Sequence, residues 1–178
     1  MITSSIGHKA AKKLDYTSLM ERREADGSSL QDVPSAFRSY CDSKLANIYF
    51  TEELDRRLQA RGVTGVYCNS CHPGTVANSG LGAAGPQPMS EFFQTLVRKT
   101  VGFVSNTTQD AAKTQTWLAA HSDVKAKDIH GQYWTPVWSW TLGYLACKKA
   151  NLTALASDKE EQRKLWDYSE DAVKKAAT

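Results

Sequence analysis

The chain has 178 residues and a formal net charge of +3, with 41% hydrophobic and 23% charged residues. This length supports one domain with its own core, and the composition is that of a soluble globular protein. The basic residues are spread out, which argues against a nucleic-acid partner, and no apolar run approaches the roughly 18 residues of a membrane span. A signal-peptide pattern is also absent, so we expect a cytoplasmic protein.

The first half of the chain predicts a strand, a long helix and a second strand. Residues 2–5 read as the end of a strand, and residues 34–60 as a helix with Pro34 in its first turn and Gly62 just past its end. The stretch VTGVYCNSC, residues 63–71, is typical of a buried strand that HPG ends. The segment ANSGLGAAGPQP that follows is rich in glycine and proline and predicts a loop.

The second half predicts three helices and one strand. Helices are expected over residues 89–104 and 106–121, the second with Asn106 as its N-cap. The stretch IHGQYWTPVW, residues 129–138, reads as the last strand, and Ser157 is the expected N-cap of a charged C-terminal helix. This order indicates an α/β fold with a parallel sheet of about three strands.

Cys68 and Cys71 have the CxxC spacing of some zinc and redox sites. On a strand, however, residues three apart point to opposite faces, and no second ligand pair has metal spacing. We therefore predict no metal site and reduced thiols throughout.

Tyr40 and Lys44 lie one helical turn apart within the sequence YCDSK. On a helix the two side chains share a face, and a nearby ammonium favours the phenolate form of a tyrosine. Such a pair could exchange a proton with a substrate at neutral pH. The spacing alone is common on helix surfaces, so its meaning depends on what surrounds it.

The surrounding motifs occur in a fixed order: TSS at the first strand end, YCDSKLAN, HPGTV at the second strand end, and the late LWDYSE. In this combination the chain resembles the short-chain dehydrogenase/reductase superfamily, and most closely its retinol-dehydrogenase-like branch. The resemblance runs from Ile2 to about Val173. It implies a Rossmann-type, doubly wound parallel sheet with flanking helices, here truncated, in a single domain over residues 1–178 with a substrate lid at 77–105.

The resemblance also implies roles for particular residues. Ser5, rather than the neighbouring Ser4, matches the serine that hydrogen-bonds the substrate oxygen. Tyr40 matches the catalytic acid/base, and Lys44 matches the lysine that favours phenolate and holds the nicotinamide ribose.

Other positions match supporting parts of the family site. The turn formed by Pro73, Gly74, Thr75 and Val76 matches the segment that meets the cofactor, together with Tyr40 and Lys44. His72 is read as ending the strand and His8 as lying at the rim of the pocket.

These matches predict an NAD(P)-dependent oxidoreductase that interconverts a hydroxyl and a carbonyl on a small apolar molecule, with NADP or NAD as cofactor. The family's Gly-rich dinucleotide motif, which precedes the catalytic serine, has no counterpart in this chain. Three alternatives follow: a fragment, a truncated enzyme, or a non-catalytic scaffold partner. The truncated enzyme would use Tyr40 and Lys44 for cofactor-independent isomerisation, dehydration or cyclisation of a polyketide-like molecule of secondary metabolism. Homo-oligomerisation, or pairing with another chain through the exposed half of the sheet, is a further expectation.

Overall fold

A computed structural model describes residues 1–16, 33–74, 107–139 and 143–177. The expected loop and helix at 77–104, the lid, Thr75 and Val76 lie outside these residues. The elements in chain order are β1 (Ile2–Thr3), the 3-10 helix η1 (Ile6–Ala10), α2 (Val33–Ala60), β2 (Asn69–Cys71), α4 (Thr108–Ala120), α5 (Ser122–Ala126), β3 (Gln132–Ser139), β4 (Gly143–Lys149) and α6 (Lys159–Ala176).

The described residues form a 4-stranded sheet in the order β1-β2-β3-β4. β1 pairs with β2 and β2 with β3 in parallel, with Thr3 opposite Cys71 and Cys71 opposite Trp134. β4 pairs with β3 in antiparallel. The α/β fold class with its mostly parallel sheet is therefore confirmed. The prediction of about three strands was too low, because β4 was not recognised.

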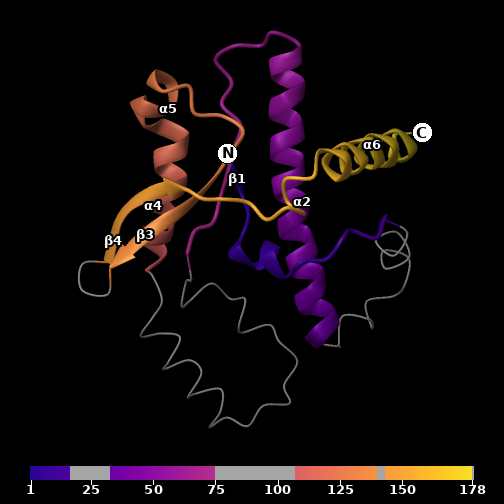
Figure 1. Ribbon diagram of the computed structural model, residues 1–178, viewed down its shortest axis with the longest axis horizontal. Coiled ribbons are helices and arrows are strands. Elements are labelled where there is room, and N and C mark those ends of the chain that lie inside the picture. Colours follow the sequence, from indigo (N-terminus) through magenta and orange to yellow (C-terminus); the bar gives the residue numbers. More distant parts are fainter. Residues whose placement is uncertain (17–32, 75–106, 140–142, 178) are drawn as a thin grey trace.

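Successive residues of β3 assign the helices to the two faces of the sheet, since neighbours on a strand point to opposite sides. Tyr133 packs in the core against Leu45 and Ile48 of α2. The same core includes Leu14, which follows η1, and Leu165 of α6. The next residue, Trp134, contacts Trp117 of α4, with ring centroids 4.9 Å apart. Figure 1 shows this arrangement, with α4 beside the β3–β4 ladder and α2 on the other side.

The long helix α2 follows the prediction closely, ending at Ala60, two residues before Gly62. Its apolar face, which includes Leu45, Ile48 and Tyr49, is completely buried. The second predicted strand, in contrast, is shorter than expected, because only Asn69–Cys71 join the sheet.

Both helix N-caps that the sequence predicted were displaced by one residue. Thr107, rather than Asn106, caps α4, and its hydroxyl accepts a hydrogen bond from the Asp110 amide at 3.1 Å. Asp158, rather than Ser157, caps α6 and accepts hydrogen bonds from the amides of Glu160 and Glu161. A carboxylate at this position also interacts favourably with the positive end of the helix dipole.

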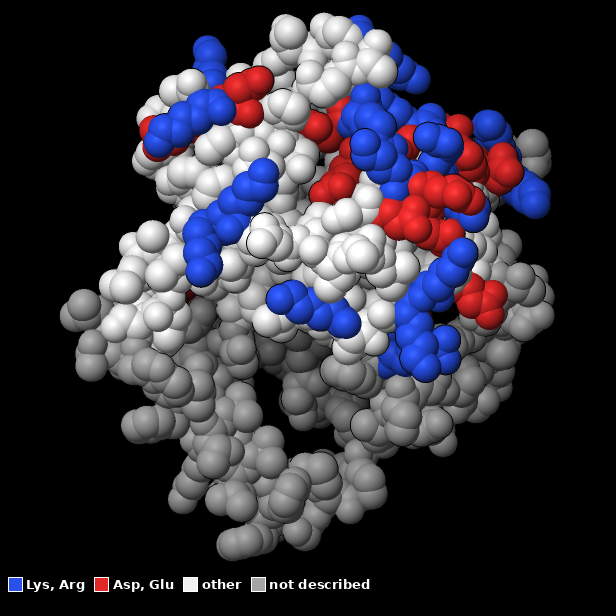
Figure 2. All heavy atoms as spheres, in the orientation of Figure 1, with Lys and Arg blue, Asp and Glu red and all other residues white. Residues whose placement is uncertain are grey.

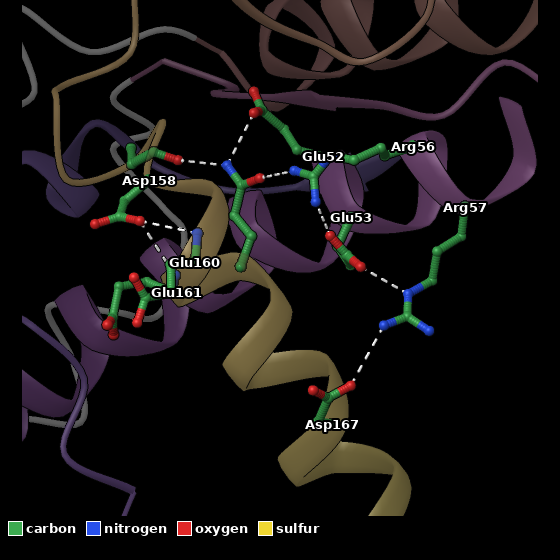
Figure 3. Close-up of polar contacts among 10 residues, drawn as sticks. Glu52, Glu53, Arg56, Arg57, Asp158, Glu160, Glu161 and Asp167 are labelled. Carbon is green, nitrogen blue, oxygen red and sulfur yellow. Dashed lines mark hydrogen bonds and ion pairs between the residues drawn. The ribbon is translucent and has the colours of Figure 1, made fainter. Parts of the chain in front are cut away.

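A polar network joins α2 to α6 (Figure 3). Gln162 is completely buried, and its amide nitrogen donates to Glu52 at 2.9 Å and to the Ala156 carbonyl at 3.0 Å. Its amide oxygen accepts from Arg56, which also pairs with the buried carboxylate of Glu53. These bonds satisfy polar groups that would otherwise be costly to bury.

The four cysteines are free, and Cys41, Cys68 and Cys71 are buried. Within the described residues no group of three or more histidine, cysteine or acidic side chains is placed to hold a metal ion. In the same part of the chain, no helix combines the length and the apolar character needed to cross a lipid bilayer.

Candidate active site

The candidate site lies at the carboxyl edge of the parallel strands. Because β1 and β2 run in parallel with Thr3 opposite Cys71, the residues that follow them, Ser4–Ser5 and His72–Gly74, emerge at the same edge. The Ser4 amide extends this pairing by donating to the Cys71 carbonyl at 2.8 Å. Ligands of open α/β sheets bind at this edge.

The two serines after β1 have different surroundings. Ser4 is 1% exposed, and its hydroxyl donates to the backbone carbonyl of Lys44 at 2.7 Å, which ties β1 to α2. Ser5 caps η1, where its hydroxyl oxygen accepts from the Gly7 amide at 3.1 Å. The hydrogen of the Ser5 hydroxyl is not used in that bond, so it can be donated to a bound oxygen.

Gly7 brings Ser5 and Tyr40 together. A Cβ built on Gly7 would lie 3.0 Å from Cε1 of Tyr40 and 3.5 Å from Oγ of Ser5. The phenol ring and the serine hydroxyl therefore flank the same small space, which only the absence of a side chain on Gly7 leaves open. Sequence reasoning did not single out this glycine.

Lys44 lies one turn after Tyr40 on α2, and its ammonium nitrogen is 5.5 Å from the centroid of the Tyr40 ring. Both side chains are partly exposed. The structure thus groups three residues: Ser5, which is the N-cap of η1, and Tyr40 and Lys44, which share one face of α2.

The turn after β2 supplies the remaining described candidates, Pro73 and Gly74. Gly74 has a φ of +90°, a conformation that residues with a side chain rarely adopt. The turn shares the sheet edge with Ser5, but the contacts of the described residues do not join it directly to Tyr40.

Two histidines line the interior behind this edge, and the expectation that His8 lies at a pocket rim was wrong. His8 is 1% exposed, and its Nδ1 lies 2.6 Å from the Ser5 carbonyl oxygen. Burial lowers the pKa of His8, and burial together with nearby His8 lowers the pKa of His72 to about 4. Both imidazoles are therefore neutral at physiological pH.

Tyr133 is a further residue of this region that sequence reasoning missed. It is 4% exposed and contacts His8 edge-on, with ring centroids 5.0 Å apart. Burial, with smaller contributions from Cys71 and Tyr40, raises the pKa of its phenol. The available signal was the predicted strand itself, because neighbouring residues on a strand point to opposite faces and Tyr133 and Trp134 must then lie on different sides of the sheet.

A hollow of about 400 Å³ opens beside these groups. Its walls come from η1, from His72 after β2, and from the paired strands β3 and β4 with the residues that follow. Ile6, which lines it, directly follows Ser5, so the hollow adjoins the grouped residues.

Comparison with known proteins shows several curated relatives. Retinol dehydrogenase 14 of Mus musculus is 35% identical over 153 residues, which cover 83% of this chain and 39% of the relative. Short-chain dehydrogenase TIC 32 A, chloroplastic, of Brassica napus is 33% identical, covering 78% of this chain and 37% of the relative. The chain belongs to the short-chain dehydrogenase/reductase superfamily. Within it, the retinol-dehydrogenase-like branch predicted from the motifs is confirmed.

Further comparisons define how much of a family member the chain represents. Protochlorophyllide reductase A, chloroplastic, of Oryza sativa subsp. japonica is 29% identical, covering 85% of this chain and 37% of the relative. A crystal structure of an uncharacterized protein from Mycobacterium paratuberculosis matches 97% of this chain and 48% of its own, at 25% identity and a TM-score of 0.58. The chain thus spans less than half the length of these short-chain dehydrogenase/reductase relatives. No protein-family model matches it.

Proposed function

We propose that the protein is an NAD(P)-dependent oxidoreductase that interconverts a hydroxyl and a carbonyl on a small apolar molecule, through Ser5, Tyr40 and Lys44. The observation that carries this proposal is the convergence of the Ser5 hydroxyl and the Tyr40 ring on the space beside Gly7. Relatives named as dehydrogenases and reductases support the same class of reaction.

The geometry suggests a separate role for each of these side chains in the reaction at the substrate oxygen. The Ser5 hydroxyl donates a hydrogen bond that holds the oxygen and stabilises negative charge on it. Tyr40, which is partly exposed, delivers a proton to that oxygen during reduction and removes it during oxidation. The Lys44 ammonium, 5.5 Å from the ring, stabilises the phenolate that remains after proton delivery.

The residues present fit the nicotinamide end of a dinucleotide. A phenol and an ammonium one helical turn apart offer hydrogen bonds to ribose hydroxyls, and the Pro73–Gly74 turn, with its positive φ at Gly74, lets backbone approach closely. The bound nicotinamide would supply or accept the hydride at the substrate carbon. The choice between NADP and NAD, the contribution of Thr75 and Val76, and the cytoplasmic location stay predictions, and two relatives are named as chloroplastic.

Substitution of Tyr40 by phenylalanine tests the proposal. Tyr40→Phe keeps the ring beside Gly7 but removes the proton donor, so kcat should fall by about 100- to 10,000-fold. The assay follows oxidation of NADPH and NADH with a panel of apolar aldehydes and ketones. Tyr144→Phe, which changes a tyrosine on β4, is the matched control and should keep its activity.

Two results would overturn the proposal. Full activity in Tyr40→Phe would remove the phenol from the reaction. Turnover by the unchanged protein that does not depend on added nicotinamide would instead favour cofactor-independent acid/base chemistry at Tyr40 and Lys44.

A further inference from the structure

The hollow beside the candidate site carries an unbalanced positive charge. Lys9 reaches it from η1, and Lys148 and Lys149 reach it from the end of β4. Among the described residues, no acidic side chain lines the hollow. Basic side chains elsewhere pair with a nearby carboxylate: Lys113 pairs with Asp110 on α4, and Lys127, at the end of α5, pairs with Asp123.

The three lysines of the hollow form no ion pair with any described residue. Lys149 interacts with Glu52 beyond ion-pair distance, and Glu52 is already held by Gln162 at 2.9 Å. On the face drawn in Figure 2, acidic side chains lie beside basic ones over α5 and around α2 and α6. In the middle, basic side chains stand on an otherwise uncharged surface.

The rest of the lining is uncharged and partly apolar. Ile6 is 56% exposed beside the hollow, and Tyr133 forms part of its floor. His72 is neutral because burial lowers its pKa, so it adds polarity without charge. A volume of about 400 Å³ is in the range of small-molecule sites. A ligand that matches all these walls has an apolar skeleton and one anionic group.

The hollow also adjoins the proposed reacting groups. Ile6 directly follows Ser5, and Tyr133 is close enough to Tyr40 for the two phenols to interact electrostatically. A molecule that lies in the hollow therefore has one side next to Ile6, the residue that follows Ser5.

We propose that this hollow binds the carboxylate of a small amphiphilic anion, and that the substrates are apolar hydroxy or oxo compounds that carry a carboxylate. The binding site stands on the lysines and the hollow alone. Its assignment to the substrate rests on the function proposed above. The two parts can therefore be tested separately.

Binding is tested first, without cofactor, by titration calorimetry with octanoate and with octanol, which differ in charge but share the chain. The unchanged protein should bind octanoate at least about 10-fold more tightly than octanol. The double variant Lys148→Gln/Lys149→Gln should lose about 10-fold in octanoate affinity. The control Lys125→Gln/Lys159→Gln removes the same net charge elsewhere and should bind like the unchanged protein.

The substrate assignment is tested by comparing a straight-chain aldehyde with the oxo acid of the same length in the nicotinamide assay. The oxo acid should have the higher kcat/KM, and Lys148→Gln/Lys149→Gln should lower kcat/KM for the oxo acid more than for the aldehyde. Circular dichroism checks that the variant is folded.

The outcomes separate the two proposals. Equal affinity for octanoate and octanol, equal loss in the control variant, or binding of inorganic phosphate as tight as that of octanoate would overturn the amphiphilic anion site. If octanoate binding depends on the lysines but Tyr40→Phe remains active, the site stands and the oxidoreductase proposal fails. If Tyr40→Phe is inactive but the oxo acid is not preferred, the oxidoreductase proposal stands and the assignment of the hollow to the substrate fails.

Discussion

Gly7 is the residue on which the geometry of the candidate site depends most directly. Its missing side chain lets the Tyr40 ring approach the Ser5 hydroxyl, and a Cβ at 3.0 Å from the ring would force the ring to shift by a few tenths of an ångström. Gly7 does not have a positive φ, so an alanine would meet no backbone penalty there. The constraint comes from the neighbouring ring alone.

Gly7→Ala should therefore damage activity more than folding. We expect kcat to fall by about 10-fold, since small displacements of reacting groups are costly, with a loss of about 1 kcal/mol in the free energy of unfolding. Steady-state kinetics and urea unfolding measure the two effects. In a Tyr40→Phe background the same change should cause no further loss of activity, and a full additional loss would show that Gly7 acts elsewhere.

For single residues, the sequence predicts the candidate catalytic side chains but not the residues that contact them in the structure. Ser5, Tyr40 and Lys44 stand in recognisable motifs, and their roles stay predictions until variants are measured. Gly7 and Tyr133 belong to no motif that was noticed, because their importance comes from contacts between η1, α2 and β3. The burial of His8 was missed for the same reason, since it depends on how η1 packs against Tyr133.

Among the elements, α6 shows how a helix boundary is decided by one side chain. The sequence predicted Ser157 as the N-cap, although serine and aspartate are both favoured at that position. In the structure the Asp158 carboxylate accepts from the amide of Glu160 at 2.9 Å and from that of Glu161 at 3.3 Å. Serine has one hydroxyl oxygen and no charge to offer the helix dipole.

Asp158→Ala should lower the free energy of unfolding by about 1 kcal/mol, the usual contribution of an N-cap. Ser157→Ala, one residue earlier, should change it by much less. Urea unfolding followed by circular dichroism compares the two variants directly. A larger effect for Ser157→Ala would place the cap where the sequence alone suggested.

The elements themselves were predicted unevenly, for physical reasons. The helices α2 and α6 carry long periodic patterns of apolar residues and were predicted almost to their ends. Only three residues of the expected strand at 63–71 pair in the sheet. The neighbouring strands β1 and β3 offer partners only to Asn69–Cys71. β4 was missed because its apolar run, YLAC, is only four residues long and is followed directly by two lysines.

For the whole molecule, the buried His8 and the half-buried His72 link stability to pH. His72 has a pKa of about 4 in the folded protein, well below the ordinary value of 6.5, and the pKa of His8 is also lowered. When a histidine has a lower pKa in the folded protein than in the unfolded chain, its full contribution to stability is present at pH values above the pKa of the unfolded chain. That contribution is lost as the pH falls from about 6.5 toward 4, because the unfolded chain then binds the protons.

The free energy of unfolding should accordingly fall in this range, with at most about 3 kcal/mol coming from His72. The variant His72→Asn should show a shallower decline over the same range. His121→Asn, which changes an exposed histidine, should keep the slope of the unchanged protein. Urea unfolding at a series of pH values gives both slopes, and equal slopes for His72→Asn and the unchanged protein would contradict the prediction.

The order of the strands is a property of the whole sheet that the local pattern did not contain. Parallel pairing of β1, β2 and β3 agrees with the helices between them, as predicted, whereas β4 adds to β3 in antiparallel. The expected pairing with another chain through an exposed half of the sheet stays a prediction. In the described sheet the edge strands are β1 and β4, so such pairing would use one of these two edges.

The buried thiols can be used to detect unfolding of the protein. Burial raises the pKa of Cys41 and Cys68 and raises that of Cys71 to about 11, and thiol reagents attack the thiolate. An alkylating probe should therefore mark these three positions only when the interior opens. Mass spectrometry of alkylated lysates would then measure the fraction of unfolded molecules without a purification step or an activity assay.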